Sequence, residues 1–167
     1  MLNMKAEHFF QNSQGSPDFA LGGYYIDQLE KVKNFVEIGR KSNARLVVGG
    51  NQPVGLDGWF FEPTVFADVT NDMEIAQEEI FGPVLSVIRV KSYDEALKLV
   101  NSHQYGNGTA IFTRDGDAAR EFASNVNVGM VGVNVPIPVP VPLFSFSGSR
   151  GSKLGDLGPY GKQVIMF

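Results

Sequence analysis

The chain has 167 residues, of which 43% are hydrophobic and 19% charged, and this composition predicts one globular domain with its own core. The net charge of -4 and the isoelectric point of about 5.1 argue against nucleic acid or an anionic membrane surface as the main partner. Because the chain has no cysteine, it cannot supply a disulfide, a cysteine-ligated metal or a cysteine nucleophile. No apolar run approaches the ~18 residues of a membrane span, so a cytoplasmic location is expected.

The first half of the chain predicts few regular elements. Residues 1–23 are polar and interrupted by glycine and proline, and they predict an irregular leader. Apolar residues at helical spacing predict a helix over residues 26–41. Residues 44–48 predict a short buried strand that stops at two glycines. The triplet at 59–61 leads into Pro63 and is therefore at best a short edge strand.

The second half predicts strands that alternate with two helices, the strands covering residues 84–90, 110–112 and 129–135. Ser92 and Glu95 form a capping box at the start of the first helix, and Asp115 caps the second. Strands that alternate with helices through short loops are typical of crossover connections, which join parallel strands. The three strands are therefore expected to be mutually parallel. The predicted fold class is therefore α/β, with a three-layer, open, mainly parallel sheet.

Prolines then occupy every second position from Pro136 to Pro142, with apolar residues between them. This strict period of two differs from the PxxP spacing of an SH3 ligand. Alternate residues of an extended chain direct their N–H groups to the same side, so the prolines remove every donor along one edge. The segment is expected to be rigid, extended and able to pair on one side only.

Glu78 and Glu79 are the first candidates for chemistry, because paired carboxylates can act as acid and base. Adjacent side chains of an extended segment point in opposite directions, which favours two solvated surface carboxylates over a cooperating pair. Phe144 and Phe146 are candidates for a substrate wall, although aromatic residues more often belong to a core.

Two glycine-containing segments could hold an anion. Residues 106–108 (GNG) more often form the turn after a helix, and they match no dinucleotide or phosphate-loop motif. Residues 148–152 (GSRGS) add the cation of Arg150. For this second segment, an anion cradle and a flexible surface loop remain equally open interpretations.

Several motifs resemble those of a known family. Residues 77–84 (QEEIFGPV) resemble the glutamate–phenylalanine signature of aldehyde dehydrogenases, and residues 105–113 and 129–134 resemble its next landmarks in order and spacing. Residues 131–140, followed by residues 144–150 (FSFSGSR), resemble the methylmalonate-semialdehyde branch. That branch makes an acyl-CoA from a malonate-type semialdehyde. The resemblance extends over almost all of the chain after the predicted leader.

The resemblance implies roles for individual residues. Glu79 matches the glutamate whose carboxylate holds the nicotinamide-side ribose hydroxyls of NAD, and Phe81 matches a phenylalanine that packs near the nicotinamide. Phe146 matches an aromatic residue that lines the substrate tunnel. Asn134 matches an asparagine that ends the preceding strand, which is a structural position.

The departures from the family pattern limit what the resemblance implies. In the family, the nucleophile is a cysteine, which lies upstream of the matching region, as does the Rossmann domain. A C-terminal oligomerisation strand follows the matching region. All three are expected to be absent from this chain. Residues 24–167 are therefore expected to be the distal part of a catalytic domain. The parent reaction would be NAD-dependent oxidation of methylmalonate or malonate semialdehyde with acyl transfer to CoA. The chain alone is expected to be inactive and to bind NAD weakly or not at all.

An alternative of a different class is a non-catalytic interaction module. In the family, the strand that matches Gly129 to Val133 accepts a strand from a neighbouring subunit. Without that donor strand, its edge is expected to pair with a second copy of the chain or with a full-length homologue. The competing expectation is a monomer in which the leader covers the edge.

Overall fold

The computed structural model describes residues 26–56, 58–141, 143, 144, 146–153, 158 and 165. The chain divides into two compact units, Met1–Arg89 and Val90–Phe167, and each is described by itself. The predicted leader at residues 1–23 lies outside the described part of the chain. Within that part, no helix is long and apolar enough to cross a bilayer.

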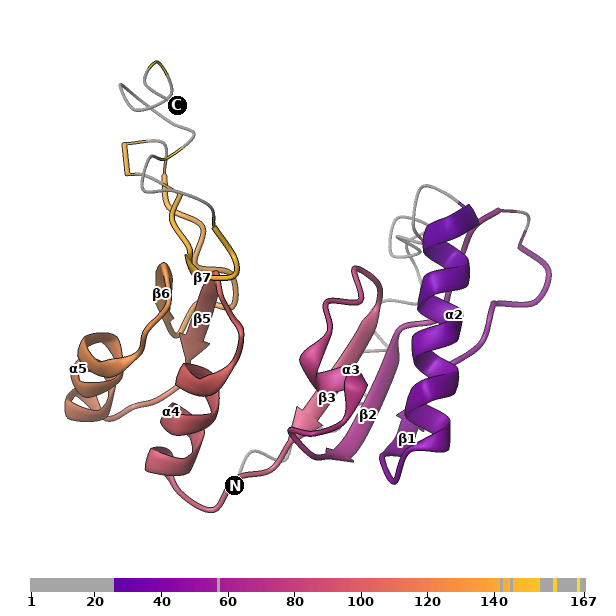
Figure 1. Ribbon diagram of the computed structural model, residues 1–167, viewed down its shortest axis with the longest axis horizontal. Coiled ribbons are helices and arrows are strands. Elements are labelled where there is room, and N and C mark those ends of the chain that lie inside the picture. The colour runs from indigo at the N-terminus through magenta and orange to yellow at the C-terminus, as the bar shows by residue number, and fades with distance from the viewer. Residues whose placement is uncertain are drawn as a thin grey trace. The chain divides into compact units, whose positions relative to one another are not determined.

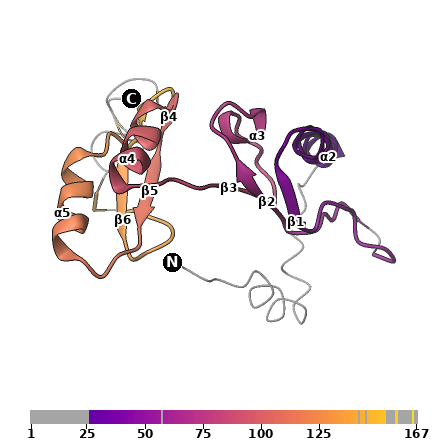
Figure 2. The ribbon, with the colours of Figure 1, turned by 90° about the horizontal axis from the view of Figure 1, so that it is seen from below.

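The first unit is a small sheet with helices on it (Figures 1 and 2). Its elements are α2 (Ile26–Lys41), β1 (Arg45–Val48), β2 (Thr64–Val69), α3 (Glu74–Gln77) and β3 (Val84–Ile88). The sheet order is β1-β2-β3, in which β1 runs antiparallel to β2 and β3 runs parallel to it. The predicted helix over residues 26–41 is confirmed.

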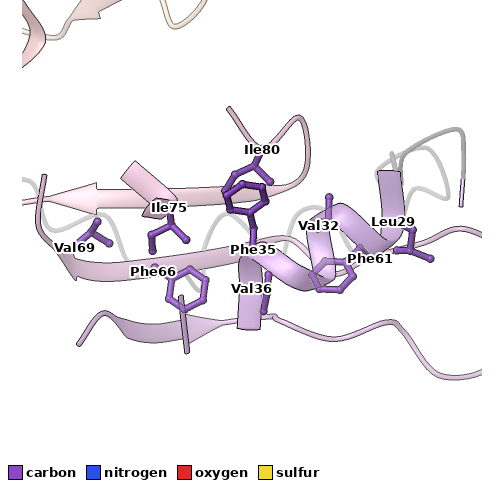
Figure 3. Packing of buried hydrophobic residues seen from close by; sticks show 9 residues of the cluster. All are labelled: Leu29, Val32, Phe35, Val36, Phe61, Phe66, Val69, Ile75 and Ile80. Atoms are coloured by element: carbon purple, nitrogen blue, oxygen red, sulfur yellow. The ribbon is translucent and has the colours of Figure 1, made fainter. Parts of the chain in front are cut away.

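The core of this unit lies between α2 and the sheet. Leu29, Val32 and Val36 are almost fully buried along one face of the helix, as its apolar spacing predicts. They pack in one cluster with Phe66 of β2, whose side chain is 0% exposed, and with residues of α3 and the segment after it (Figure 3). Gly39 lets the ring of Phe66 reach the helix backbone, because an added Cβ would lie 2.6 Å from Phe66 Cζ.

The predicted edge strand at residues 59–61 is wrong. These residues are irregular, and the strand begins after Pro63, at Thr64. Proline has no N–H to donate to a ladder, so pairing starts at the next residue. Gly49 ends the preceding strand with a φ of 74°, and an added Cβ there would meet the Pro63 carbonyl oxygen.

In the second unit, the residues that the structure describes form two further pairs of strands and two helices. Its elements are α4 (Tyr93–Ser102), β4 (Tyr105–Gly106), β5 (Gly108–Ile111), α5 (Gly116–Asn125), β6 (Met130–Val133) and β7 (Ser149–Arg150). β5 and β6 are parallel, as predicted, whereas β4 and β7 are antiparallel. The two helices contact each other through Tyr93 and Phe122, whose ring centroids lie 6.4 Å apart in an edge-to-face arrangement.

Both predicted helix caps are confirmed. The Ser92 hydroxyl accepts a hydrogen bond from the Glu95 amide, and the Glu95 carboxylate accepts one from the Lys91 amide. The Asp115 carboxylate accepts hydrogen bonds from two amides at the start of α5. These bonds satisfy N–H groups that have no partner within the helix.

The expectation of one open, mainly parallel sheet needs correction. The described residues form a mixed α/β fold with small sheets, and among them two strand pairs are parallel and two antiparallel. β3 pairs with β2, a strand that the sequence prediction had missed. The predicted turn at residues 106–108 is also wrong, because Gly106 belongs to β4 and pairs with Ser149.

Candidate functional site

The segment that carries Glu79 and Phe81 connects α3 to β3. Ile80 lies between them and is only 7% exposed, because it belongs to the core cluster of the first unit (Figure 3). Its two neighbours are exposed, and the Phe81 side chain is 72% exposed. Ile80 thus anchors the segment, while the carboxylate and the aromatic ring on either side of it remain open to a ligand.

Two polar side chains of α2 hold the backbone of this segment. Gln28 Nε2 donates hydrogen bonds of 2.8 Å to the carbonyl oxygens of both Ile80 and Phe81. Lys31 Nζ donates one of 2.8 Å to the carbonyl oxygen of Glu79. Three successive carbonyl groups are therefore bound by one helix, which fixes the backbone that displays the exposed side chains.

The backbone turns sharply at the end of the segment. Phe81 has a φ of 56°, in the left-handed region that non-glycine residues seldom adopt. Gly82 packs directly on α2, since an added Cβ would lie 2.4 Å from Val32 Cγ2. A large residue held in this conformation at an exposed position is typical of functional segments.

The structure does not bring Glu78 and Glu79 together as an acid–base pair. Glu78 has extended backbone angles, φ −101° and ψ 147°, and both residues are exposed. Adjacent side chains of an extended backbone diverge, so each carboxylate acts alone. A single exposed carboxylate can accept two hydrogen bonds from a diol, and the neighbouring ring can pack on a planar heterocycle.

Phe146 belongs to the second unit, so the structure describes it separately from Glu79 and Phe81. Its side chain is half-buried. Phe144 is 66% exposed, so the prediction that it belongs to a core is wrong. The next residue, Ser147, donates a hydrogen bond of 2.8 Å to the carbonyl oxygen of Gly129. Phe146 therefore emerges from a backbone that is tied to the start of β6.

Asn134 occupies the structural position that the resemblance implied. Its side chain accepts a hydrogen bond from the Thr113 amide at 2.9 Å and donates one to the Thr113 carbonyl at 3.0 Å. Its own amide donates to the Ile111 carbonyl at 2.8 Å. These three bonds join the end of β6 to the last residue of β5 and to the segment that follows it.

Arg150 is not part of a flexible surface loop. It forms β7 with Ser149, and its guanidinium donates to the carbonyl oxygens of Val100, Tyr105 and Asn127. In the part of the chain that the structure describes, no group of three or more histidine or acidic side chains could hold a metal ion.

The sequence prediction did not identify Gln28 or Lys31 as residues that hold the segment after α3. They lie three residues apart on α2, beside the buried stripe, and in the sequence they look like ordinary solvated helix residues. Only their contact with carbonyl groups about 50 residues away reveals their role. No local signal in the sequence could have found them, because a backbone acceptor has no residue identity.

Comparisons with known proteins give one consistent family. The aldehyde dehydrogenase family model matches residues 12–167, beginning within the predicted leader. A malonate-semialdehyde dehydrogenase of Pseudomonas aeruginosa is 51% identical over 140 residues, which are 82% of this chain and 28% of that protein.

Solved structures agree with the sequence comparison. A methylmalonate-semialdehyde dehydrogenase from Oceanimonas doudoroffii is 46% identical with a TM-score of 0.80, covering 83% of this chain and 29% of that one. An aldehyde dehydrogenase from Mycobacterium tuberculosis, complexed with NAD+, is 37% identical with a TM-score of 0.75, covering 83% and 29%. The chain spans about 27–32% of the length of the curated relatives that it matches.

Proposed function

Because this chain belongs to the aldehyde dehydrogenase family, we propose that it forms part of the nucleotide and substrate surface of an NAD-dependent semialdehyde dehydrogenase. The proposed parent reaction is oxidation of methylmalonate or malonate semialdehyde, followed by acyl transfer to CoA. Relatives named for these semialdehydes are 44–51% identical to the chain. That likeness supports the choice of substrate class.

The observation that carries this proposal is the display of Glu79 and Phe81 from a fixed backbone. The carboxylate of Glu79 would accept hydrogen bonds from the two ribose hydroxyls on the nicotinamide side of NAD. The exposed ring of Phe81 would pack beside the nicotinamide. Bound NAD would supply the hydride acceptor, and the chain's own contribution is to bind and orient it.

Phe146 would border the substrate, where its ring excludes water from the aldehyde. The chain has no cysteine, so the thiohemiacetal and the thioester must form on a residue outside this sequence. We therefore expect no turnover by the chain alone. We also expect NAD dissociation constants beyond about 1 mM, because most contacts of a dinucleotide are missing from this part of the fold.

A chimaera tests the proposal directly. Residues 12–167 would replace the matching segment of the Oceanimonas doudoroffii enzyme, and NADH formation would be followed with malonate semialdehyde, NAD and CoA. The chimaera should be active, and Glu79→Gln should raise the KM for NAD at least tenfold, with little change in the KM for the semialdehyde. Glu78→Gln is the matched control, because it removes an adjacent exposed carboxylate and should leave both constants unchanged.

Two outcomes would contradict the proposal. One is a correctly folded chimaera that does not form NADH. The other is an equal effect of the two glutamine variants. For the separate chain, NADH release well above a blank without protein, or micromolar NAD binding by calorimetry, would refute the expected inactivity and weak binding.

A second candidate function rests on the edge of β6. Among the described residues, β6 pairs only with β5, and its residues Met130 to Val133 carry no charge that would block another strand. Pro138 packs over a face of this sheet and not along its edge, since added Cβ atoms on Gly108 and Gly132 would lie 3.2 and 3.3 Å from it. This arrangement favours association with a second copy or with a full-length homologue.

Light scattering after size-exclusion chromatography tests this second function. The chain should form a dimer or larger oligomer, and Val131→Lys should dissociate it. Val87→Lys is the control, because Val87 is an exposed valine on a strand of the first unit. A clean monomer at high micromolar concentration, or equal effects of the two lysines, would rule out assembly through β6.

A further inference from the structure

One guanidinium group joins four parts of the second unit. Arg150 Nη2 donates hydrogen bonds to the Tyr105 carbonyl at 2.6 Å and to the Val100 carbonyl at 3.2 Å. Nη1 donates to the Asn127 carbonyl. The acceptors lie in the last turn of α4, in β4 and in the loop after α5, while Arg150 itself belongs to β7. A charged donor therefore binds three backbone groups that lie 23, 45 and 50 residues away from it in sequence.

The residues before Arg150 are fixed by the same neighbours. Ser149 pairs with Gly106 across the β4–β7 ladder, and its hydroxyl donates to the Asn127 carbonyl at 3.0 Å. Ser147 donates to the Gly129 carbonyl. The backbone at Ser147 crosses Gly129 so closely that an added Cβ would lie 2.1 Å from the Ser147 carbonyl oxygen. These contacts fix the backbone from Ser147 to Arg150 at both ends.

The groups around the guanidinium indicate that its charge has a structural role and does not bind an anion. Carbonyl oxygens carry partial negative charge, and Val100 lies in the last turn of a helix, where the macrodipole favours a cation. The remaining nitrogen, Nε, is buried without a hydrogen-bond partner among the described residues. An anion would have to displace the carbonyl groups that already surround the charge.

We propose that Arg150 is a positioning residue that sets the place of Phe146. By joining α4, β4 and the loop after α5 to β7, the guanidinium fixes the short segment from which Phe146 emerges. An effect of this placement on substrate binding rests on the proposed function, whereas the contacts of Arg150 are independent of it. Arginine suits the task because its planar fork reaches several acceptors at fixed angles, whereas lysine supplies a single point charge.

A fluorine label tests the placement in this chain without any activity. 4-Fluorophenylalanine is introduced at Phe146, or at Phe122 as a reporter of the fold, since Phe122 is only 6% exposed. In Arg150→Met, the resonance at position 146 should narrow and move toward that of the free amino acid, and the resonance at position 122 should not change. Arg150→Lys should give an intermediate shift. Arg114→Met removes an exposed arginine of the same unit and is the control.

Three results would overturn the proposal. The first is an unchanged position-146 resonance in the folded Arg150→Met protein. If that variant does not fold, an unchanged resonance in Arg150→Lys has the same meaning. The second is an equal change at positions 146 and 122, which shows a general loss of stability. The third is a saturable shift on titration with inorganic phosphate that disappears in Arg150→Lys, which would establish an anion site in place of the positioning role.

The chimaera described above supplies the functional arm. There, Arg150→Lys should lower kcat/KM for malonate semialdehyde by about tenfold, since a misplaced binding wall has effects of this order or larger. The KM for NAD should stay the same. An unchanged kcat/KM would mean that the placement of Phe146 does not matter for substrate. An inactive chimaera would refute the proposed function, whereas the fluorine spectra would still decide the role of Arg150.

Discussion

Gly39 and Phe66 allow a sharp test of how the first unit packs. In an ordinary helix, replacing an interior glycine with alanine stabilises the helix by about 0.8–1 kcal/mol. Here an added Cβ would lie 2.6, 2.9 and 3.0 Å from three carbon atoms of the Phe66 ring. That ring is fully buried in the core cluster between α2 and the sheet, so it has little room to move (Figure 3).

The expected magnitude follows from these two opposing effects. Overpacking a core costs about 1–3 kcal/mol, which exceeds the gain in helix propensity. Gly39→Ala should therefore destabilise the first unit by about 1 kcal/mol. In a Phe66→Leu background the clash is relieved, and the same change should become neutral or stabilising. The coupling free energy between the two sites should be at least about 1 kcal/mol.

Urea unfolding followed by fluorescence measures these free energies. The single tryptophan, Trp59, lies in the first unit and is 49% exposed, so its emission reports on that unit. Gly116→Ala is the control, because Gly116 is helical and an added Cβ would meet only the end of the Arg120 side chain, at 3.6 Å. It should be neutral or slightly stabilising by circular dichroism. A stabilising effect of Gly39→Ala in the original background, or zero coupling with Phe66→Leu, would refute the packing argument.

Three further predictions follow from local contacts. Ser92→Ala and Asp115→Ala should each lower the free energy of unfolding by about 0.5–2 kcal/mol, as thermal unfolding would show, and intact stability would mean that the caps contribute nothing. Gly82→Ala should speed amide exchange in the segment after α3, because its Cβ would overlap Val32, and unchanged exchange would contradict this contact. Burial of the hydroxyl, followed by the nearby charges of Glu121 and Asp94, raises the pKa of Tyr93. Because the folded state disfavours ionisation of this hydroxyl, the stability should decline as the pH rises from about 10 through the folded-state pKa, and Tyr93→Phe should flatten this decline in alkaline unfolding curves.

Local interactions explain most of what the sequence predicted correctly. The helix over residues 26–41 follows from apolar spacing, and the caps at Ser92 and Asp115 follow from side chains that bond amides two or three residues away. The parallel pairing of β5 with β6 follows from the helix between them. The outward display of Glu79 was predicted in the same way, from the divergence of adjacent side chains.

The tertiary structure decided the features that depend on distant partners. β2 was missed because its pairing with β1 and β3 comes from residues about 20 away on either side. The pairing of β4 with β7, which turned a predicted helix turn into a strand, depends on residues more than 40 positions apart. Gln28, Lys31 and Arg150 act on backbone carbonyl groups, whose positions leave no trace in the local sequence. The sequence by itself thus determined α2, α4 and α5, the caps of α4 and α5, and the family, whereas α3, the strand partners and the roles of these polar side chains required the folded chain.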